Sequence, residues 1–135
     1  MAKGIEIREA HYPGRAPIDA YGAGGFRFAD MSHRGSILCL PSGVHGWDVS
    51  DPDGITEAAL EQVLAEAGDI EVLLVGMGID FQRMPKDVQA VLRDKGIVTD
   101  SMSTGSAVRT FNVLLAEDRA VAAALIAVDD PGKRA

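Results

Sequence analysis

Residues 97–128 read IVTDSMSTGSAVRTFNVLLAEDRAVAAALIAV, and in this segment a helical pattern stands between two extended apolar ones. The apolar residues of 97–102 predict a strand, and Ser103 or Thr104 suits the N-cap of the helix that follows. Residues 121–128 predict a final strand, although their alanines leave a helical interpretation open. Two strands joined through a helix imply parallel pairing by a right-handed crossover.

The segment before residue 97 continues this alternation of helices and strands. An amphipathic helix is predicted between Thr56, a suitable N-cap, and Gly68, a suitable end. Residues 70–75 then predict a buried strand, and a second helix begins at Pro85 and ends at Gly96. The apolar stripes of the first and third helices are Leu60, Val63, Leu64 and Ala67, and Ala107, Val108, Phe111, Leu114 and Leu115.

Glycine and a period of two mark the amino-terminal half. Glycines at 22, 24 and 25 predict a tight turn, and therefore a β-hairpin or meander, because glycine adopts positive φ without steric cost. Residues 35–40 predict a strand that is buried on both faces and ended by Pro41. The alternating apolar residues around the glycine turn and at the start of the chain are Ile5, Ile7, Ile18, Ala20, Phe26 and Phe28.

These patterns predict one compact α/β domain. Its sheet is mixed, with a β-rich amino-terminal half that contains the hairpin and a β-α-β-α-β carboxyl-terminal half. At 135 residues the chain is long enough for one core and too short for two. We therefore expect a single domain over 1–135, with a core at about 4–128 and a frayed tail at 129–135.

The charge balance argues against nucleic acid as a partner. Thirteen Lys and Arg residues face twenty Asp and Glu residues, which gives a net charge of −7. The basic residues are scattered along the chain, so the surface repels phosphate backbones and anionic membranes.

The sequence predicts no signal for export or membrane insertion. Its start has no apolar core typical of a signal peptide, and the longest apolar stretches, 72–79 and 121–128, are shorter than the roughly 20 residues that cross a bilayer. The lone Cys39 lies in an aliphatic run, which predicts an inert core thiol and fits a reducing compartment. We expect a cytoplasmic protein.

Metal, cofactor and nucleophilic chemistry find little support in the sequence. Cys39 and the three histidines, His11, His33 and His45, lack any metal-ligand spacing, and His33 is expected to lie in a turn with Arg34. No Gly-Lys-Ser or Gly-Lys-Thr phosphate loop occurs, and neither Ser36 nor Ser106 lies in a G-x-S-x-G elbow. We expect no metal, no cofactor and no catalytic residues.

A glycine turn after a predicted strand is the first candidate ligand site. Gly76 and Gly78 follow the strand at 70–75, where ligands commonly bind in open α/β sheets, but Phe81 replaces the third glycine of a dinucleotide-binding motif. Asp80 could act there as a base or could simply cap the loop. A tight turn required only for packing is the favoured interpretation of these glycines.

The start of the helix after residue 102 is the second candidate site. Thr104, Gly105 and Ser106 form a small-residue strand-to-helix turn, where unpaired N–H groups and the helix dipole favour an anion, and Arg109 lies nearby. Asn112 completes this candidate set. The alternatives are that Ser103 and Thr104 only cap the helix and that Arg109 pairs with Glu117 or another carboxylate.

Four stretches resemble successive motifs of one known family. They are YGAGGFRF at 21–28, RGSIL at 34–38 with Pro41 and Trp47, LLVGMG at 73–78, and STGSAVRTFNVLLAEDR at 103–119. Over about 18–126 the chain resembles the family of mitochondrial complex I assembly factor 3 and its small prokaryotic homologues of unknown function. Ser106 and Val108 depart from the family pattern, in which we expect an alanine and a cysteine, and the missing cysteine argues against a shared thiol activity.

The resemblance implies a three-layer α/β fold with an added β-hairpin and, for the mitochondrial members, a role in assembling the respiratory NADH dehydrogenase. It favours a non-catalytic interaction or assembly protein whose partner is another protein, for example a respiratory-complex subunit. The alternative is a small anionic-ligand binder or weak enzyme that uses the turn at 76–80 and the helix start at 103–109. Whether the chain forms a homodimer is left open.

Overall fold

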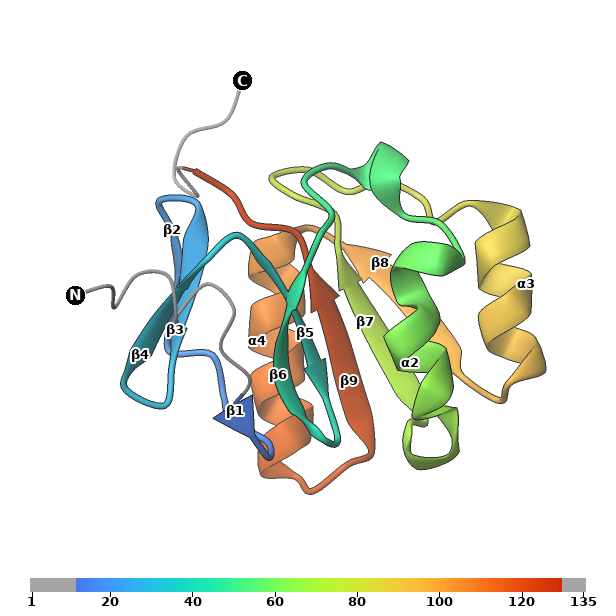
Figure 1. Cartoon of the computed structure of the whole chain (residues 1–135), viewed down its shortest axis with the longest axis horizontal. Helices are drawn as coiled ribbons and strands as arrows, with labels where there is room; N and C mark the ends of the chain where they lie inside the picture. The colour runs from blue at the N-terminus through green and yellow to red at the C-terminus, as the bar shows by residue number, and fades with distance from the viewer. Residues whose placement is uncertain (1–11, 130–135) are drawn as a thin grey trace.

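Two β-sheets form the framework of the protein, whose computed structural model describes residues 12–129 (Figure 1). The larger sheet has six strands in the order β1-β6-β5-β9-β7-β8, and the smaller sheet has three in the order β2-β3-β4. The strands are β1 Tyr12–Pro13, β2 Ala20–Gly22, β3 Gly25–Phe28, β4 Met31–Arg34, β5 Ser36–Leu40, β6 Gly43–Trp47, β7 Val72–Gly76, β8 Val98–Met102 and β9 Val121–Leu125. The α-helices are α2 Glu61–Ala65, α3 Lys86–Asp94 and α4 Thr104–Ala116, and short 3₁₀ turns lie at Pro52–Gly54 (η1), Ala58–Leu60 (η2) and Ala67–Asp69 (η3).

The large sheet is mixed, as the sequence predicts. Its carboxyl-terminal strands β7, β8 and β9 run parallel, with β7 between the other two. Strand β9 also pairs antiparallel with β5, β5 pairs antiparallel with β6, and β6 pairs antiparallel with β1. The last strand within residues 12–129 therefore lies inside the sheet and joins its two halves.

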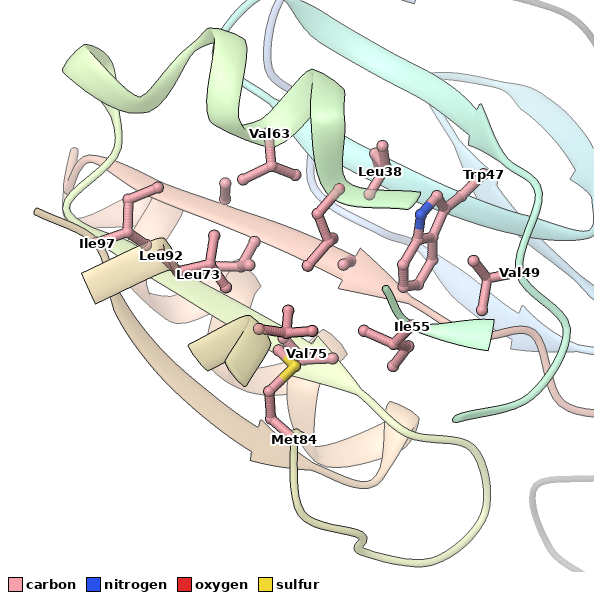
Figure 2. Close-up of a cluster of buried hydrophobic side chains, with 14 of the residues drawn as sticks. Leu38, Trp47, Val49, Ile55, Val63, Leu73, Val75, Met84, Leu92 and Ile97 are labelled. Carbon is pink, nitrogen blue, oxygen red and sulfur yellow. The ribbon is translucent and has the colours of Figure 1, made fainter. Parts of the chain in front are cut away.

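Two apolar clusters on opposite faces of the large sheet give the three layers. Because side chains alternate along a strand, Leu73 and Val75 of β7 enter the cluster under α2 and α3, while Leu74 enters the cluster under α4 and the small sheet. Figure 2 shows the first cluster, in which Trp47 and Leu92 lie among aliphatic side chains. The predicted single α/β fold with three layers is confirmed.

Strand β9 settles the alternative that its alanines left open. All five of its residues, Val121–Leu125, are buried, and three of them are alanines. Ala122 and Ala124 face the α2 and α3 layer, whereas Ala123 faces the α4 layer. A strand buried on both faces needs no polar alternation, so its composition alone could not separate it from a helix.

The small sheet confirms the predicted meander but corrects the position of one turn. Ala29 and Asp30, with φ values of 50° and 63°, make the two-residue turn between β3 and β4. His33, expected in a turn, lies instead within β4 opposite Phe26 and is 4% exposed. Strand alternation is the reason, because Ser32 and Arg34 on either side of it point outward.

The helix predicted from Thr56 to Gly68 is shorter and less regular than expected. Thr56 caps its start, since Thr56 Oγ1 accepts a hydrogen bond from Ala59 N at 3.2 Å. Between residues 56 and 68 the chain is α-helical only in α2, which the 3₁₀ turns η2 and η3 flank. Gly68 lies inside η3 and does not end the helix. One cause is tertiary: Trp47 Nε1 donates to Ala59 O at 2.8 Å, and a continuous α-helix would use that carbonyl itself.

The other predicted elements are found close to their expected positions. Helix α3 follows Pro85 and ends before Gly96, which has a φ of 84°, and β5 is buried along its whole length.

Some predictions fall outside the described residues: those for Ile5, Ile7 and His11, and that for the tail at 129–135 except for Asp129. The carbonyl oxygen of Asp129 accepts a hydrogen bond from Ala23 N at 2.7 Å. Within 12–129, no helix is both long enough and apolar enough to span a bilayer.

Candidate functional site

The carboxyl ends of the three parallel strands meet at one edge of the large sheet. Gly76, the last residue of β7, is in register with Met102 at the end of β8 and with Leu125 at the end of β9. The predicted glycine turn follows β7 there, and the predicted helix start follows β8. The topology thus brings together the two candidate sites, which are 26 residues apart in sequence at Gly78 and Thr104.

Thr104 connects the segments that follow these three parallel strands. Its side chain is 0% exposed, and its hydroxyl donates to Ile126 O at 2.7 Å and accepts from Gly78 N at 3.0 Å. Thr104 N also donates to Gly78 O at 2.8 Å. Gly76 allows this close approach, since a Cβ there would lie 2.9 Å from Thr104 Cα and 3.1 Å from Leu125 Cδ2.

The helix cap comes from Ser103. Of the two hydroxyls that the sequence offered as the cap of α4, Ser103 Oγ accepts from Ser106 N at 3.3 Å, whereas Thr104 is the first residue of the helix. Arg109 is exposed and its Nη2 donates to Ser106 Oγ at 3.3 Å. The sequence left open that Arg109 pairs with Glu117, but within residues 12–129 the ion pair found is that of Arg119 with Glu71.

A pocket of about 200 Å³ opens beside this helix start. Three of the predicted residues, Gly78, Gly105 and Arg109, contribute to its wall. The complete lining is Tyr21, Gly78, Ile79, Ser103, Gly105, Arg109 and Val128. The pocket therefore presents two hydroxyls, one guanidinium and glycine backbone to the solvent.

Tyr21, like Val128, lines the pocket but is not among the predicted site residues. It comes from β2 of the small sheet, and its hydroxyl lies against Gly105, where an added Cβ would be 3.1 Å from Tyr21 Cζ. The same Cβ would lie 3.7 Å from Arg109 Nη1. Only tertiary structure brings this tyrosine to the helix start, so local patterns in the chain gave no sign of it.

The other predicted site residues lie around this pocket without lining it. Gly76 and Thr104 pack against each other, Ser106 Oγ accepts a hydrogen bond from Arg109, and Asp80 is an exposed residue of the loop after β7. Asn112 lies further along α4, where its Oδ1 accepts from Ile18 N at 2.8 Å and its Nδ2 donates to Ile18 O at 2.9 Å. Ligand binding by these five residues stays a prediction.

Asn112→Ala tests the structural part of this arrangement. The substitution removes both hydrogen bonds to Ile18, whose side chain is 3% exposed, and we expect the free energy of unfolding to fall by about 2 kcal/mol. Urea denaturation followed by circular dichroism measures the change. Val113→Ala, at an exposed position next to it on α4, is the matched control and should change stability by less than about 0.5 kcal/mol.

Cys39 has the environment predicted for an inert thiol. It is 3% exposed in β5, and burial raises its pKa from 9.0 to about 12. We expect the native protein to resist thiol-reactive disulfide reagents at pH 8 and the urea-unfolded protein to react fully.

The same shift in the pKa of Cys39 sets a pH dependence of stability. Between pH 9 and 12 the unfolded thiol loses its proton while the folded one keeps it, so stability falls as the pH rises. A Cys39→Ala variant is expected to lose less stability than the wild type between pH 8 and pH 10. Equal losses in the two proteins would contradict the assignment.

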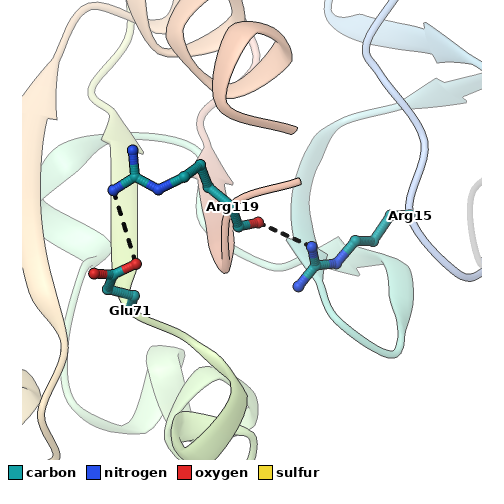
Figure 3. A network of polar contacts seen from close by, with 3 residues as sticks. All are labelled: Arg15, Glu71 and Arg119. Atoms are coloured by element: carbon teal, nitrogen blue, oxygen red, sulfur yellow. Dashed lines mark hydrogen bonds and ion pairs between the residues drawn. The ribbon is translucent and has the colours of Figure 1, made fainter. Parts of the chain in front are cut away.

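The opposite end of α4 carries a polar network on the surface. Arg15 Nη1 donates to the carbonyl oxygen of Arg119 at 3.0 Å, and Arg119 Nη2 lies 3.8 Å from Glu71 Oε1 (Figure 3). The ion-pair side chains are 47% and 60% exposed, so water screens the pair and it contributes little to stability.

Within residues 12–129, no group of His, Cys, Asp and Glu is arranged to hold a metal ion.

Comparison with known protein sequences finds relatives over the part of the chain, about 18–126, for which the sequence predicts a family resemblance. A family model described as protein of unknown function (DUF498/DUF598) matches residues 18–126. An uncharacterized protein of Rhodobacter capsulatus is 41% identical over 119 residues, which are 88% of this chain and 90% of that protein. The mouse NADH dehydrogenase [ubiquinone] 1 alpha subcomplex assembly factor 3 is 31% identical over 131 residues, 97% of this chain and 70% of that protein.

Solved structures share the fold. A crystal structure described as an outer membrane protein from Bartonella henselae is 61% identical, with a TM-score of 0.85 over 88% of this chain and 100% of that chain. The solution structure of a Bordetella pertussis protein, described as an Mth938-like domain, is 28% identical, with a TM-score of 0.75 over 85% of this chain and 87% of that chain.

Proposed function

This chain belongs to the family of proteins of unknown function DUF498/DUF598, and we propose that it acts there as a non-catalytic interaction protein in the assembly of a respiratory complex. The observation that carries the proposal is the 31% identity to mouse complex I assembly factor 3 over 97% of this chain. An alignment of that length covers both sheets and all three helices, so it involves the whole folded surface and not a local motif.

The site is consistent with binding. The polar side chains that line the pocket are Tyr21, Ser103 and Arg109, which offer hydrogen bonds and a positive charge to a partner. Thr104, the first residue of α4, has its hydroxyl engaged with backbone groups of Gly78 and Ile126. These hydrogen bonds hold the turn after β7 and the start of α4 together, and a site whose backbone is held in place before binding loses less entropy when a partner binds.

The partner proposed is a protein, a subunit or assembly intermediate of the respiratory NADH dehydrogenase, met at the cytoplasmic side of the membrane. Homodimerisation remains a separate question that sedimentation of the purified chain answers. Because a relative from Bartonella henselae is described as an outer membrane protein, cell fractionation is the direct test of the cytoplasmic location.

Affinity capture from the native cell tests the proposed function. The tagged chain is purified from detergent-solubilised cells, and the co-purified proteins are identified by mass spectrometry against a tagged unrelated protein of similar charge. We expect enrichment of NADH dehydrogenase subunits, and a deletion strain should accumulate less assembled complex on native gels. Repeated capture of no specific protein, together with normal complex levels in the deletion strain, would refute the proposal.

A second candidate function is the binding of a small anion in the pocket. The observation that favours it is the convergence of Gly78, Gly105 and Arg109, from two candidate segments, on one pocket at a helix start. An anion there would meet the Arg109 guanidinium and the Tyr21 and Ser103 hydroxyls.

Thermal denaturation with inorganic phosphate, AMP and citrate at millimolar concentration tests this second function. A ligand present at a large excess over its dissociation constant should raise the melting temperature by about 3 °C or more. Arg109→Ala should abolish the rise, whereas Arg93→Ala, an exposed arginine at the end of α3, should keep it. No rise with any of the three anions, or an equal rise in Arg109→Ala, would argue against the site.

A further inference from the structure

Strand β8 ends the large sheet in the part of the chain that the structure describes, and one side of its backbone is free there. Over residues 12–129 it pairs only with β7, beside which it lies at the sheet edge (Figure 1). Val98 N donates to Glu71 O at 3.0 Å and Met102 O accepts from Met77 N at 2.8 Å, so both ends of β8 face β7. Backbone groups alternate sides along a parallel strand, so Thr99 and Ser101 direct their N–H and C=O groups outward.

A groove of about 210 Å³ runs beside this free edge. It is built by the loop after β7, the start of α3 and the strand itself. Its lining is Phe81, Arg83, Met84, Lys86, Gln89, Thr99, Asp100 and Ser101. Two of the three large apolar residues that stand exposed within 12–129 lie here or on β8, Phe81 at 58% and Val98 at 62%.

The lining of the groove carries two cations, Arg83 and Lys86, and one carboxylate, Asp100. The register pairs Thr99 with Leu73 and Ser101 with Val75, which places both residues on the sheet face covered by α3. Arg83 and Lys86 are exposed in the groove on that side of β8. A strand added at the edge would therefore direct every second side chain toward two cations, on a protein whose net charge is −7.

Asp100 argues against a second copy of the chain as that strand. Antiparallel self-pairing over all of Val98–Met102 would set Asp100 directly opposite its own copy, and like charges in that position destabilise a sheet. A charged residue at the centre of a short edge strand is a common guard against such pairing. Pairing of β8 with a second copy of itself is therefore disfavoured.

We propose that the free edge of β8 receives an extended acidic segment of a partner protein as an added strand. Backbone hydrogen bonds to Thr99 and Ser101 would hold the segment, and carboxylates opposite these residues would meet Arg83 and Lys86. The inference rests on the proposed function in that the chain is an interaction protein, but it uses a surface separate from the pocket at the start of α4.

Peptide titration of the full, isotope-labelled chain tests the proposal. The probe is a capped seven-residue peptide that alternates valine with glutamate. Saturable shifts of the Thr99 and Ser101 amide signals are expected, with slower hydrogen exchange at both. A peptide with lysine in place of glutamate, and one with alternate backbone nitrogens methylated, should each bind at least about tenfold more weakly.

Thr99→Pro removes one outward N–H that the described fold does not use, and it should weaken the binding of the valine–glutamate peptide about tenfold while the protein stays folded. Thr99→Ala keeps that N–H and is the matched control, with binding expected within about twofold of wild type. The double variant Arg83→Glu, Lys86→Glu should weaken binding about fivefold or more, whereas Arg93→Glu, Lys95→Glu, an equal charge change at the far end of α3, should not.

Equal binding of the glutamate and lysine peptides, or unchanged binding by Thr99→Pro, would overturn the proposal. Self-association of the wild-type chain that Thr99→Pro abolishes would also overturn it, because a second copy would then occupy the edge. The failure of this proposal can be told apart from the failure of the proposed function. If wild type and Thr99→Pro capture the same cellular partner equally, the proposed function stands and the proposal for β8 is wrong. If peptides bind at β8 but no cellular partner is captured, the proposal for β8 stands and the proposed function is wrong.

Discussion

Gly25→Ala is expected to lower the free energy of unfolding by about 3 kcal/mol or more. Gly25 begins β3 and is buried, and a Cβ there would overlap the carbonyl oxygen of His33 in the neighbouring strand. The same Cβ would lie 3.1 Å from His33 C and 3.2 Å from Arg34 Cα. These are backbone atoms, so the clash is relieved only if β3 moves away from β4 and their hydrogen bonds weaken.

Chemical denaturation in urea, followed by circular dichroism, measures this loss. Gly68→Ala is the matched control, because a Cβ there meets nothing within 4 Å and the residue is not among the glycines with positive φ. The control should leave the free energy of unfolding unchanged or raise it by about 0.5 kcal/mol. A Gly25→Ala protein within about 1 kcal/mol of wild type would mean that the two strands are further apart than the structure has them.

Thr104→Val is expected to cost about 3 kcal/mol of stability, nearly as much as the glycine change. Valine has the shape of threonine, so packing is kept, but the hydroxyl that binds Gly78 N and Ile126 O is lost. Both backbone groups would then lose a partner at a position where the side chain is 0% exposed. A buried polar group without a partner costs about 1–3 kcal/mol.

The control for Thr104 is Thr104→Ser, which keeps the hydroxyl and loses one methyl group. It should cost about 1 kcal/mol, the value of one buried methyl group. Hydrogen exchange supplies a local readout, since Thr104→Val should speed exchange at the Gly78 amide far more than Thr104→Ser does. Equal losses of stability in the two variants would show that the methyl group, and not the hydrogen bonds, stabilises this turn.

The sequence predicts the layers of this fold well because its helices and strands differ in period. Residues 70–75 and 97–102 gave β7 and β8 within two residues, and Pro85 and Gly96 bracket α3. The helix from Thr56 was predicted too long, since the pattern of apolar residues does not reveal that the Trp47 indole binds a carbonyl of the segment. Local patterns predict elements best where no distant side chain competes for their backbone.

The candidate site was predictable only in its parts. Both halves of the pocket wall, Gly78 and Gly105 with Arg109, were identified because a glycine turn after a strand and a small-residue helix start have local signatures. Tyr21 was not, since it reaches the pocket from another sheet. Thr104 was read as a cap or an anion ligand, and its actual hydrogen bonds depend on the register of β7 and β9, which no local pattern encodes.

The central position of β9 has a consequence for how the protein is made. Residues 121–125 are synthesised after β5 and β7, yet they fill the gap between these two strands. Until then the nascent chain holds two apolar strands without their common neighbour. Folding of the large sheet should therefore wait until β9 has left the ribosome, and until then the nascent protein should depend on chaperones that shield exposed strands.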